Sequence, residues 1–121
     1  MRSIRLTPRL RTVADLVPSG TRLVDVGTDH AYLPACLLQE GRISRAVVSD
    51  LRSGPLERAR ATAARYGLTG RMDFRLCNGL AGISPQEADT VVIAGMGGET
   101  IAAILEAAPW TAEGEHLLLL Q

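Results

Sequence analysis

The residues best suited to chemistry follow four short apolar segments of the chain. DVGTDHA occupies residues 25–31, the next apolar segment ends in Asp50, CNG occupies residues 77–79 and AGMGG occupies residues 94–98. Ligands of open α/β sheets bind beyond the carboxyl ends of the strands, so four such segments would share one edge of a sheet. Carboxylates, an amide and glycines at one edge are typical of a site that the backbone approaches closely.

Two of these positions suggest a nucleoside ligand. Asp50 ends the apolar segment that follows the one containing Asp25. A carboxylate there can accept hydrogen bonds from both ribose hydroxyls, and we favour this role over a simple strand-end cap. Asn78 can present its amide to an adenine edge beside Gly79, although an ordinary Asn-Gly turn explains this pair better when it is taken alone.

The loop at residues 25–31 separates two cofactor chemistries. A dinucleotide site is marked by GxGxxG, which seats a pyrophosphate on a helix N-terminus, but no glycine follows Gly27 until Gly41. Asp29 would also repel a pyrophosphate. S-adenosylmethionine carries a sulfonium and an ammonium group and no phosphate, so a carboxylate in this loop is compatible with it. The sequence therefore disfavours an NAD-dependent oxidoreductase and favours S-adenosylmethionine as the cofactor.

The composition indicates an ordered domain of modest size. The chain has 121 residues, of which 46% are hydrophobic and 3% aromatic, which is enough for one domain with an aliphatic core. No apolar run is long enough to span a bilayer, and no signal peptide opens the chain. Cys36 and Cys77 lack metal-ligand spacing, so we expect buried, reduced thiols in a cytoplasmic protein without bound metal.

The net charge of zero hides a strong asymmetry. Residues 1–75 carry all thirteen arginines and seven acidic residues, a formal charge of +6, whereas residues 76–121 carry six acidic residues and no basic one. Either the basic part faces a polyanion such as RNA, or the two parts neutralise each other across the fold.

Apolar periodicity predicts alternating helices and strands. Helices are expected at residues 7–17, 32–40, 53–66 and 99–108, and strands at residues 23–26, 45–50, 72–77, 90–94 and 115–121. Such alternation predicts an α/β fold, a mostly parallel sheet with helices on both faces, within one domain over residues 1–121. The last strand is apolar on both faces, so we expect either a longer protein that continues beyond it or a partner that covers this edge.

Three motifs give the chain a specific resemblance. DVGTDHAYLP at residues 25–34, NGL at residues 78–80 and IAGMGG at residues 93–98 resemble the motifs of the bacterial tRNA (adenine(22)-N(1))-methyltransferase family. RLRTVADLVP at residues 9–18 is similar to the first helix of that family. The likeness covers essentially the whole chain, and DHAYLP together with AGMGG is rare outside the family.

The resemblance implies a Rossmann-like class I methyltransferase domain that binds S-adenosylmethionine and methylates N1 of an adenine in the tRNA D-arm. The cofactor contacts that it implies are Asp25, Gly27, Thr28, Asp29, Asp50, Leu51, Asn78, Gly79, Ala94 and Gly95. Family members continue beyond this point with further strands and a helical extension. A fragment that stops at the fifth strand could therefore keep these loops without being active.

Methylation of adenine N1 needs little acid–base chemistry, because N1 has a lone pair and is itself the nucleophile. The enzyme mainly has to hold the reactants in line. Asp29 could stabilise the positive charge that develops on the ring, or bind the ammonium group of the cofactor. His30 could orient the base, or cap the helix that follows. Tyr32 could stack on a flipped adenine, or simply pack its helix on the sheet.

Further residues are candidates for contacts with tRNA. Arg5 and Arg9 lie in the basic start of the chain and are expected to bind phosphates, unless they belong to a solvated helix face. Met96, Gly97 and Gly98 are expected to form the wall where the target base enters, within a tight turn. Two alternatives stay open, namely a methyltransferase of the same fold with another substrate and a non-catalytic fragment that binds the cofactor or RNA.

Overall fold

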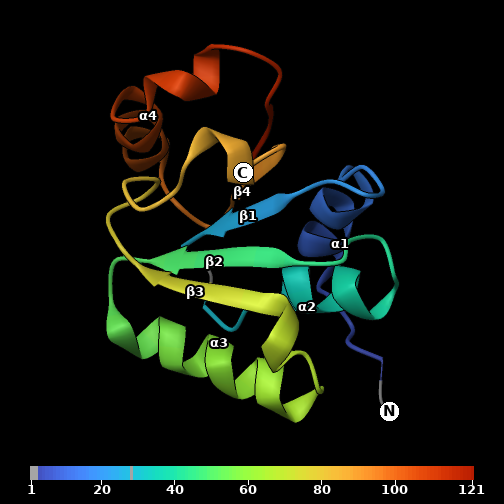
Figure 1. The fold of residues 1–121 in the computed structure, drawn as a ribbon. Helices are drawn as coiled ribbons and strands as arrows, with labels where there is room; N and C mark the ends of the chain where they lie inside the picture. The colour runs from blue at the N-terminus through green and yellow to red at the C-terminus, as the bar shows by residue number, and fades with distance from the viewer. Residues whose placement is uncertain (1–2, 28) are drawn as a thin grey trace.

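The computed structural model describes residues 3–27 and 29–121, which form one parallel sheet of five strands in the order β3-β2-β1-β4-β5 (Figure 1). The strands are β1 Leu23–Val26, β2 Ala46–Asp50, β3 Met72–Leu76, β4 Thr90–Ile93 and β5 Leu117–Leu120. The helices are α1 Pro8–Asp15, α2 Tyr32–Gln39, α3 Ser53–Arg65 and α4 Gly98–Glu106, with 3-10 turns at Thr69–Arg71, Pro85–Glu87 and Pro109–Ala112. The strand order reverses direction between β1 and β4, which is the topological switch point where such sheets bind ligands.

Alternate residues of the strands divide the core into two layers. On one face of the sheet, Leu23 and Val92 pack with buried residues of α1, α2 and α3. On the other face, Val24 and Val91 pack with Ile104 of α4. Figure 1 shows α2 and α3 on one side of the sheet and α4 on the other. The predicted parallel sheet with helices on both faces is therefore confirmed.

The burial of each strand follows its place in the sheet. Every residue of β1 and β4 is buried, because both strands have neighbours on either side. β3 is an edge strand and is mostly half-buried, in agreement with its predicted weaker cover. β5 forms the opposite edge, where Leu117 is 39% and Leu120 45% exposed.

The predicted helix boundaries agree with the structure within two residues. Thr7 caps α1 as expected: its hydroxyl accepts a hydrogen bond from the N–H of Leu10 at 3.3 Å, and Pro8 takes the first helical position. α1 ends at Asp15 rather than at residue 17. The cause is Pro18, which disfavours the helical conformation at the residue before it.

One of the two cysteines differs from the prediction. Cys36 is buried as expected, and this burial raises the pKa of its thiol. Cys77 is only partly buried, and the prediction for it was wrong. It directly follows the edge strand β3, which has a neighbouring strand on one side only.

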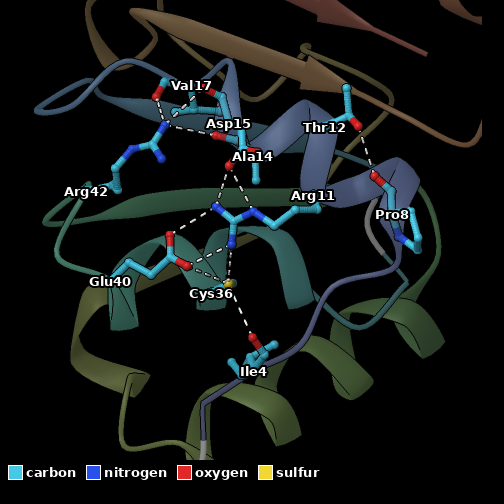
Figure 2. A network of polar contacts seen from close by, with 10 residues as sticks. All are labelled: Ile4, Pro8, Arg11, Thr12, Ala14, Asp15, Val17, Cys36, Glu40 and Arg42. Carbon is cyan, nitrogen blue, oxygen red and sulfur yellow. Dashed lines mark hydrogen bonds and ion pairs between the residues drawn. The ribbon is translucent and has the colours of Figure 1, made fainter.

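A polar network centred on Arg11 fastens α1 to α2 (Figure 2). Its guanidinium forms ion pairs with Asp15 at 2.8 Å and with Glu40, directly after α2, at 2.7 Å. The same guanidinium lies 3.6 Å from the sulfur of Cys36, whose thiol donates to the carbonyl of Ile4 at 3.5 Å. The network therefore holds the N-terminal segment and α1 in a fixed position against α2.

Arg42 supplies hydrogen-bond partners to the C-terminal end of α1. Its Nη2 donates to the carbonyls of Ala14 at 3.0 Å, Asp15 at 3.4 Å and Val17 (Figure 2). The last carbonyls of a helix lack partners within the helix, and a cation is also favoured there by the helix dipole. Arg42 is thus an internal cap rather than a surface charge available to a partner.

Two ion pairs join the basic and the acidic parts of the chain. Arg22 binds Asp89 at 2.8 Å, and Arg75 binds Glu87 at 2.6 Å. Hydrogen bonds from these arginines lower the pKa of Asp89 and that of Glu87 to about 2. Mutual neutralisation therefore accounts for part of the charge asymmetry.

The Glu87→Gln variant should lose about 1 kcal/mol of unfolding free energy at neutral pH, the upper end for an ion pair near the surface. The pKa of Glu87 is lower in the folded protein than its ordinary value of 4.5, so the stabilisation is complete above that pH and disappears as the pH falls towards about 2. Urea unfolding of wild type and variant should give a difference that shrinks over this range. A difference that stays constant with pH, or that also occurs in the exposed-site control Glu113→Gln, would contradict this role of the ion pair.

Replacing Arg11 by Met should loosen α1 without unfolding the sheet, because it removes the guanidinium and keeps most of the apolar stem. Backbone amides of residues 9–15 should exchange with deuterium severalfold faster, while those of β1 keep their rates. Hydrogen-exchange mass spectrometry measures both. Arg22→Met is the matched control, since it breaks an exposed ion pair away from α1. Equal exchange of α1 in both variants would show that the network does not hold this helix.

Candidate functional site

The turn after β1 begins with a glycine whose position demands the absence of a side chain. Gly27 has a φ of +72°, and its N–H donates to the carbonyl of Ser49 at 2.8 Å. A Cβ at this position would lie 1.8 Å from the terminal methyl group of Met96. The left-handed φ favours glycine at this position, and the Met96 side chain from the loop after β4 packs into the space that a side chain at Gly27 would take.

Two hollows open at the carboxyl ends of the strands. The β1–β4 hollow has a volume of about 420 Å³, and the predicted residues that line it are Asp25, Gly27, Asp29, His30, Tyr32, Ala94, Gly95 and Arg9. The β2–β3 hollow has a volume of about 550 Å³, and the predicted residues that line it are Gly27, Asp50, Leu51, Asn78, Gly79, Gly95 and Met96. Gly27 and Gly95 line both hollows, so a single elongated ligand could occupy the two.

The β1–β4 hollow combines charges of both signs. Asp25 is 5% exposed and lies at the end of β1, while Asp29 follows in the loop. Arg9 reaches the same hollow from the first turn of α1. One guanidinium and two carboxylates suit a ligand that carries both an ammonium and a carboxylate group. Arg9 therefore lies where it can bind such a carboxylate as well as a phosphate.

The β2–β3 hollow combines hydrogen-bonding groups with an apolar wall. Asp50 ends β2, and its Oδ1 accepts a hydrogen bond from the N–H of Arg52 at 3.0 Å. Leu51 is 65% exposed beside it, and Asn78 faces the same hollow from the loop after β3. An exposed leucine, an amide and a carboxylate at one site match the ring, the base edge and the sugar hydroxyls of a nucleoside.

Ser49 was not among the predicted residues, yet it connects the loops of three strands. Its carbonyl accepts the hydrogen bond from Gly27, and its hydroxyl donates to the carbonyl of Gly79 at 3.2 Å. The side chain is fully buried. A polar residue in an otherwise apolar strand was the only available sequence signal. Ser49 therefore sets the distance between the loops after β1 and β3.

Asp29 is held by an arginine that the sequence analysis did not single out. Arg58 of α3 donates to Asp29 Oδ1 from Nη2 at 2.8 Å and from Nε at 3.1 Å, while His30 Nε2 lies 3.6 Å from Oδ2. The hydrogen bonds from Arg58 lower the pKa of Asp29, so the carboxylate is charged at neutral pH. Its side chain is 70% exposed, which leaves it accessible to a ligand.

The residue between His30 and Tyr32 has a backbone conformation that is rare for alanine. Ala31 is fully buried, has a φ of +57° and forms the N-cap of α2 without a side-chain hydrogen bond. Residues with such conformations concentrate at functional sites. The resulting turn places the rings of His30 and Tyr32 parallel, with centroids 5.1 Å apart.

This geometry decides between the alternatives for the two rings. The alternative that His30 caps α2 finds no support among the described residues, where His30 Nε2 lies 3.6 Å from Asp29 Oδ2 and its ring stacks on Tyr32. The alternative that Tyr32 packs α2 on the sheet was wrong, because the side chain is 41% exposed. Both rings instead line the β1–β4 hollow.

Some predicted residues lie apart from the two hollows or outside the described chain. Gly97 is the N-cap of α4 and Gly98 its first residue, and neither lines the hollows. Arg5 lines a separate depression beside Tyr32. Thr28 falls outside the residues that the structure describes.

Arg58 could have been suspected from its place in the chain. It lies in the second turn of α3, which begins three residues after β2 ends. The first turns of a helix that follows a parallel strand lie near the carboxyl edge of the sheet. The helical periodicity of α3 does not indicate that Arg58 binds Asp29, because Asp29 belongs to a loop that is far away in sequence.

Within the described residues, no cluster of three or more His, Cys, Asp or Glu side chains is arranged to hold a metal ion. None of the helices in this part of the chain combines the length and apolarity that a membrane-spanning segment needs.

Comparison with known proteins identifies proteins that are similar in sequence and in fold. The chain is 39% identical to the tRNA (adenine(22)-N(1))-methyltransferase of Bacillus subtilis over all of its 121 residues, which are 51% of that protein. The crystal structure of the B. subtilis M1A22 tRNA methyltransferase TrmK is similar with a TM-score of 0.91 and 38% identity, over 97% of this chain and 50% of that one. M. capricolum TrmK in complex with S-adenosyl-homocysteine is similar with a TM-score of 0.79 and 37% identity, over 85% of this chain and 47% of that one.

These likenesses confirm the resemblance predicted from the three motifs and the Rossmann-like methyltransferase fold. The chain spans about half the length of the relatives that it matches. The sequence model of the family described as Methyltransferase domain matches residues 6–121. Since this match extends over nearly the whole chain, the chain belongs to the methyltransferase domain family.

Proposed function

We propose that this chain belongs to a tRNA methyltransferase that transfers a methyl group from S-adenosylmethionine to N1 of an adenine in the D-arm. The observation that carries the proposal is the meeting of the two hollows at Gly27 and Gly95, at the switch point of the sheet. The activity of the B. subtilis relative and the cofactor product bound to M. capricolum TrmK support the reaction and the cofactor.

The residues of both hollows fit the parts of S-adenosylmethionine. Asp50 would accept hydrogen bonds from the ribose hydroxyls, and Asn78 would bind the edge of the adenine ring, with Leu51 against its face. On the other side of Gly27, Arg9 and Asp25 would bind the charged amino-acid tail. Gly27 and Gly95, which line both hollows, would lie along the centre of the molecule.

Bound S-adenosylmethionine would supply an electrophilic methyl group on sulfur. The protein would hold adenine N1 in line with it, so that the N1–C bond forms as the S–C bond breaks, and the electron pair of that bond stays on sulfur. The ring of the product adenine is a cation. Asp29 lines the β1–β4 hollow and is ionised at neutral pH. Its carboxylate would stabilise the positive charge that develops on the adenine ring.

The two aromatic rings suit the target base. An adenine in a folded tRNA arm must leave its stack before it can be modified. Tyr32 is exposed at the β1–β4 hollow and backed by His30, so it can replace the lost stacking. A tRNA substrate would place the protein in the cytoplasm.

We expect this chain to bind S-adenosylmethionine, and the Asp50→Ala variant to bind it tenfold to a hundredfold more weakly, at the scale of charge-assisted hydrogen bonds. Isothermal titration measures both affinities. Asp73→Ala is the matched control. It removes one carboxylate near the amino ends of the strands, away from both hollows, and should leave the affinity unchanged. Binding of NADH in place of S-adenosylmethionine, or equal affinities of both variants, would contradict the assignment of the hollows.

The Asp29→Asn variant should methylate an unmodified tRNA transcript at least tenfold more slowly than the wild-type chain, with a Kd for S-adenosylmethionine within about twofold of the original value. The amide is of nearly the same size but cannot neutralise the cationic ring. Mass spectrometry of the digested RNA measures N1-methyladenosine under single-turnover conditions. A variant that loses cofactor affinity instead would assign Asp29 to the ammonium group. No product from the wild-type chain would restrict the proposal for this chain to cofactor binding.

A further inference from the structure

A groove lined by arginines and aromatic rings lies beside the β1–β4 hollow and extends beyond the residues assigned to methyl transfer. It consists of two depressions of about 220 and 540 Å³, and Tyr32 and Tyr66 line both of them. Arg58 and Arg65 line the first depression, and Arg5 lines the second. We call this surface the α3 groove, and define it by His30, Tyr32, Arg58, Arg65, Tyr66 and Arg5.

The α3 groove is continuous with the β1–β4 hollow. His30 and Tyr32 line the hollow and also the first depression of the groove. Their rings are stacked, with planes 10° apart, and Tyr32 is 41% exposed. A chain-like ligand could therefore have one unit in the hollow and the next ones along the groove, with aromatic faces at Tyr32 and Tyr66.

The groove is strongly basic. Arg58 and Arg65 lie seven residues apart on α3, which puts them on the same side of the helix. No acidic side chain lines either depression, and the carboxylate that borders them, Asp29, is already bound to Arg58. Among residues 3–27 and 29–121, Arg5 and Arg65 take part in no ion pair, in contrast to Arg22 and Arg75.

The arginines keep donors for further partners. The guanidinium of Arg58 has more N–H groups than its two hydrogen bonds to Asp29 use. The guanidinium of Arg65 lies 5.5 Å from the ring centroid of Tyr66 and remains exposed. The guanidinium lies over one face of the Tyr66 ring, so a base at Tyr66 would meet the other face of the ring or the guanidinium plane itself.

We propose that the α3 groove binds the RNA strand next to the methylated adenine, with phosphates on Arg5, Arg58 and Arg65 and a neighbouring base stacked at Tyr66, while Tyr32 holds the target adenine. The proposal rests on the proposed function, because it takes the adenine in the β1–β4 hollow as its starting point. Single-stranded nucleic acid is bound in this way, by a positively charged groove with aromatic platforms. A base that leaves its stack also frees the neighbouring bases for such stacking. An acidic protein segment would match the charge but would leave the aromatic faces unused.

The test is titration of a fluorescein-labelled RNA hairpin, with an unpaired adenine in its loop, by this chain at several salt concentrations. Fluorescence anisotropy should give a Kd about threefold to tenfold higher for Arg65→Gln, and a salt slope of log K lower by about one unit, because one phosphate contact is lost. Arg60→Gln is the matched control. It removes the same charge from the same helix, but Arg60 packs over the ring of Phe74, outside the groove. Its Kd and slope should stay close to those of the wild type.

Tyr66 tests the stacking part of the proposal separately. Tyr66→Leu should raise the Kd severalfold with little change in the salt slope, because a stacking face is lost and no charge is. Tyr66 also packs against the core, so Tyr66→Phe is included as the variant that keeps the ring and the packing. Its affinity for the hairpin should be that of the wild type. Equal losses in Tyr66→Leu and Tyr66→Phe would overturn the stacking role.

The outcomes separate the groove from the proposed function. Unchanged RNA binding by Arg65→Gln, or an equal effect of Arg60→Gln, would overturn the groove while binding of S-adenosylmethionine kept the proposed function intact. Weaker RNA binding by Arg65→Gln in a chain that does not bind S-adenosylmethionine would support the groove and overturn the proposed function. Displacement of the hairpin by poly-glutamate at equal charge would assign the groove to acidic protein segments and overturn the proposal.

Discussion

The packing of β1 between β2 and β4 is the constraint on which the site depends. All residues of β1 are buried, and its parallel register pairs Val26 with Ser49 on one side and with Ile93 on the other. The three strands therefore end at nearly the same level, and their loops leave the sheet at one point. The chain turns in opposite directions from this point, since β2 and β4 lie on opposite sides of β1. A shift of β1 by one residue would exchange its two faces and separate the loops.

Hydrogen bonds carry this order from the strands into the loops. Ser49 connects Gly27 to Gly79, and the N–H of Gly95 donates to the carbonyl of Gln121 at 3.0 Å. Each bond satisfies a backbone group that the end of a strand would otherwise leave without a partner. The loops can thus be rigid while the side chains that face the hollows, such as those of Asp29, Leu51 and Asn78, remain exposed. This combination of a fixed backbone and accessible side chains is what binding a small ligand in a defined pose requires.

The arginines have separate tasks that a count of charges does not distinguish. Arg11 and Arg42 hold α1 in place, and α1 in turn carries Arg9 to the β1–β4 hollow. Arg22 and Arg75 are bound to acidic residues of the second part of the chain. The arginines that line the α3 groove come from the start of the chain and from α3, and they lie around Tyr32 and Tyr66. Net charge is zero, yet one face is basic.

Apolar periodicity and strand–helix alternation are local patterns. They were therefore sufficient to predict the order and type of the elements, the parallel sheet and the convergence of four loops. The sequence also identified Gly27, Asp50 and Asn78, whose residue types mark the ends of strands. It could not identify Ser49 or Arg58, because their partners, Gly79 and Asp29, come from other loops. It left open the roles of His30 and Tyr32, which depend on the left-handed turn at Ala31. Which arginines form ion pairs within the fold and which face a ligand depends on the tertiary structure. An arginine is available to a ligand only where packing leaves it without an acidic partner.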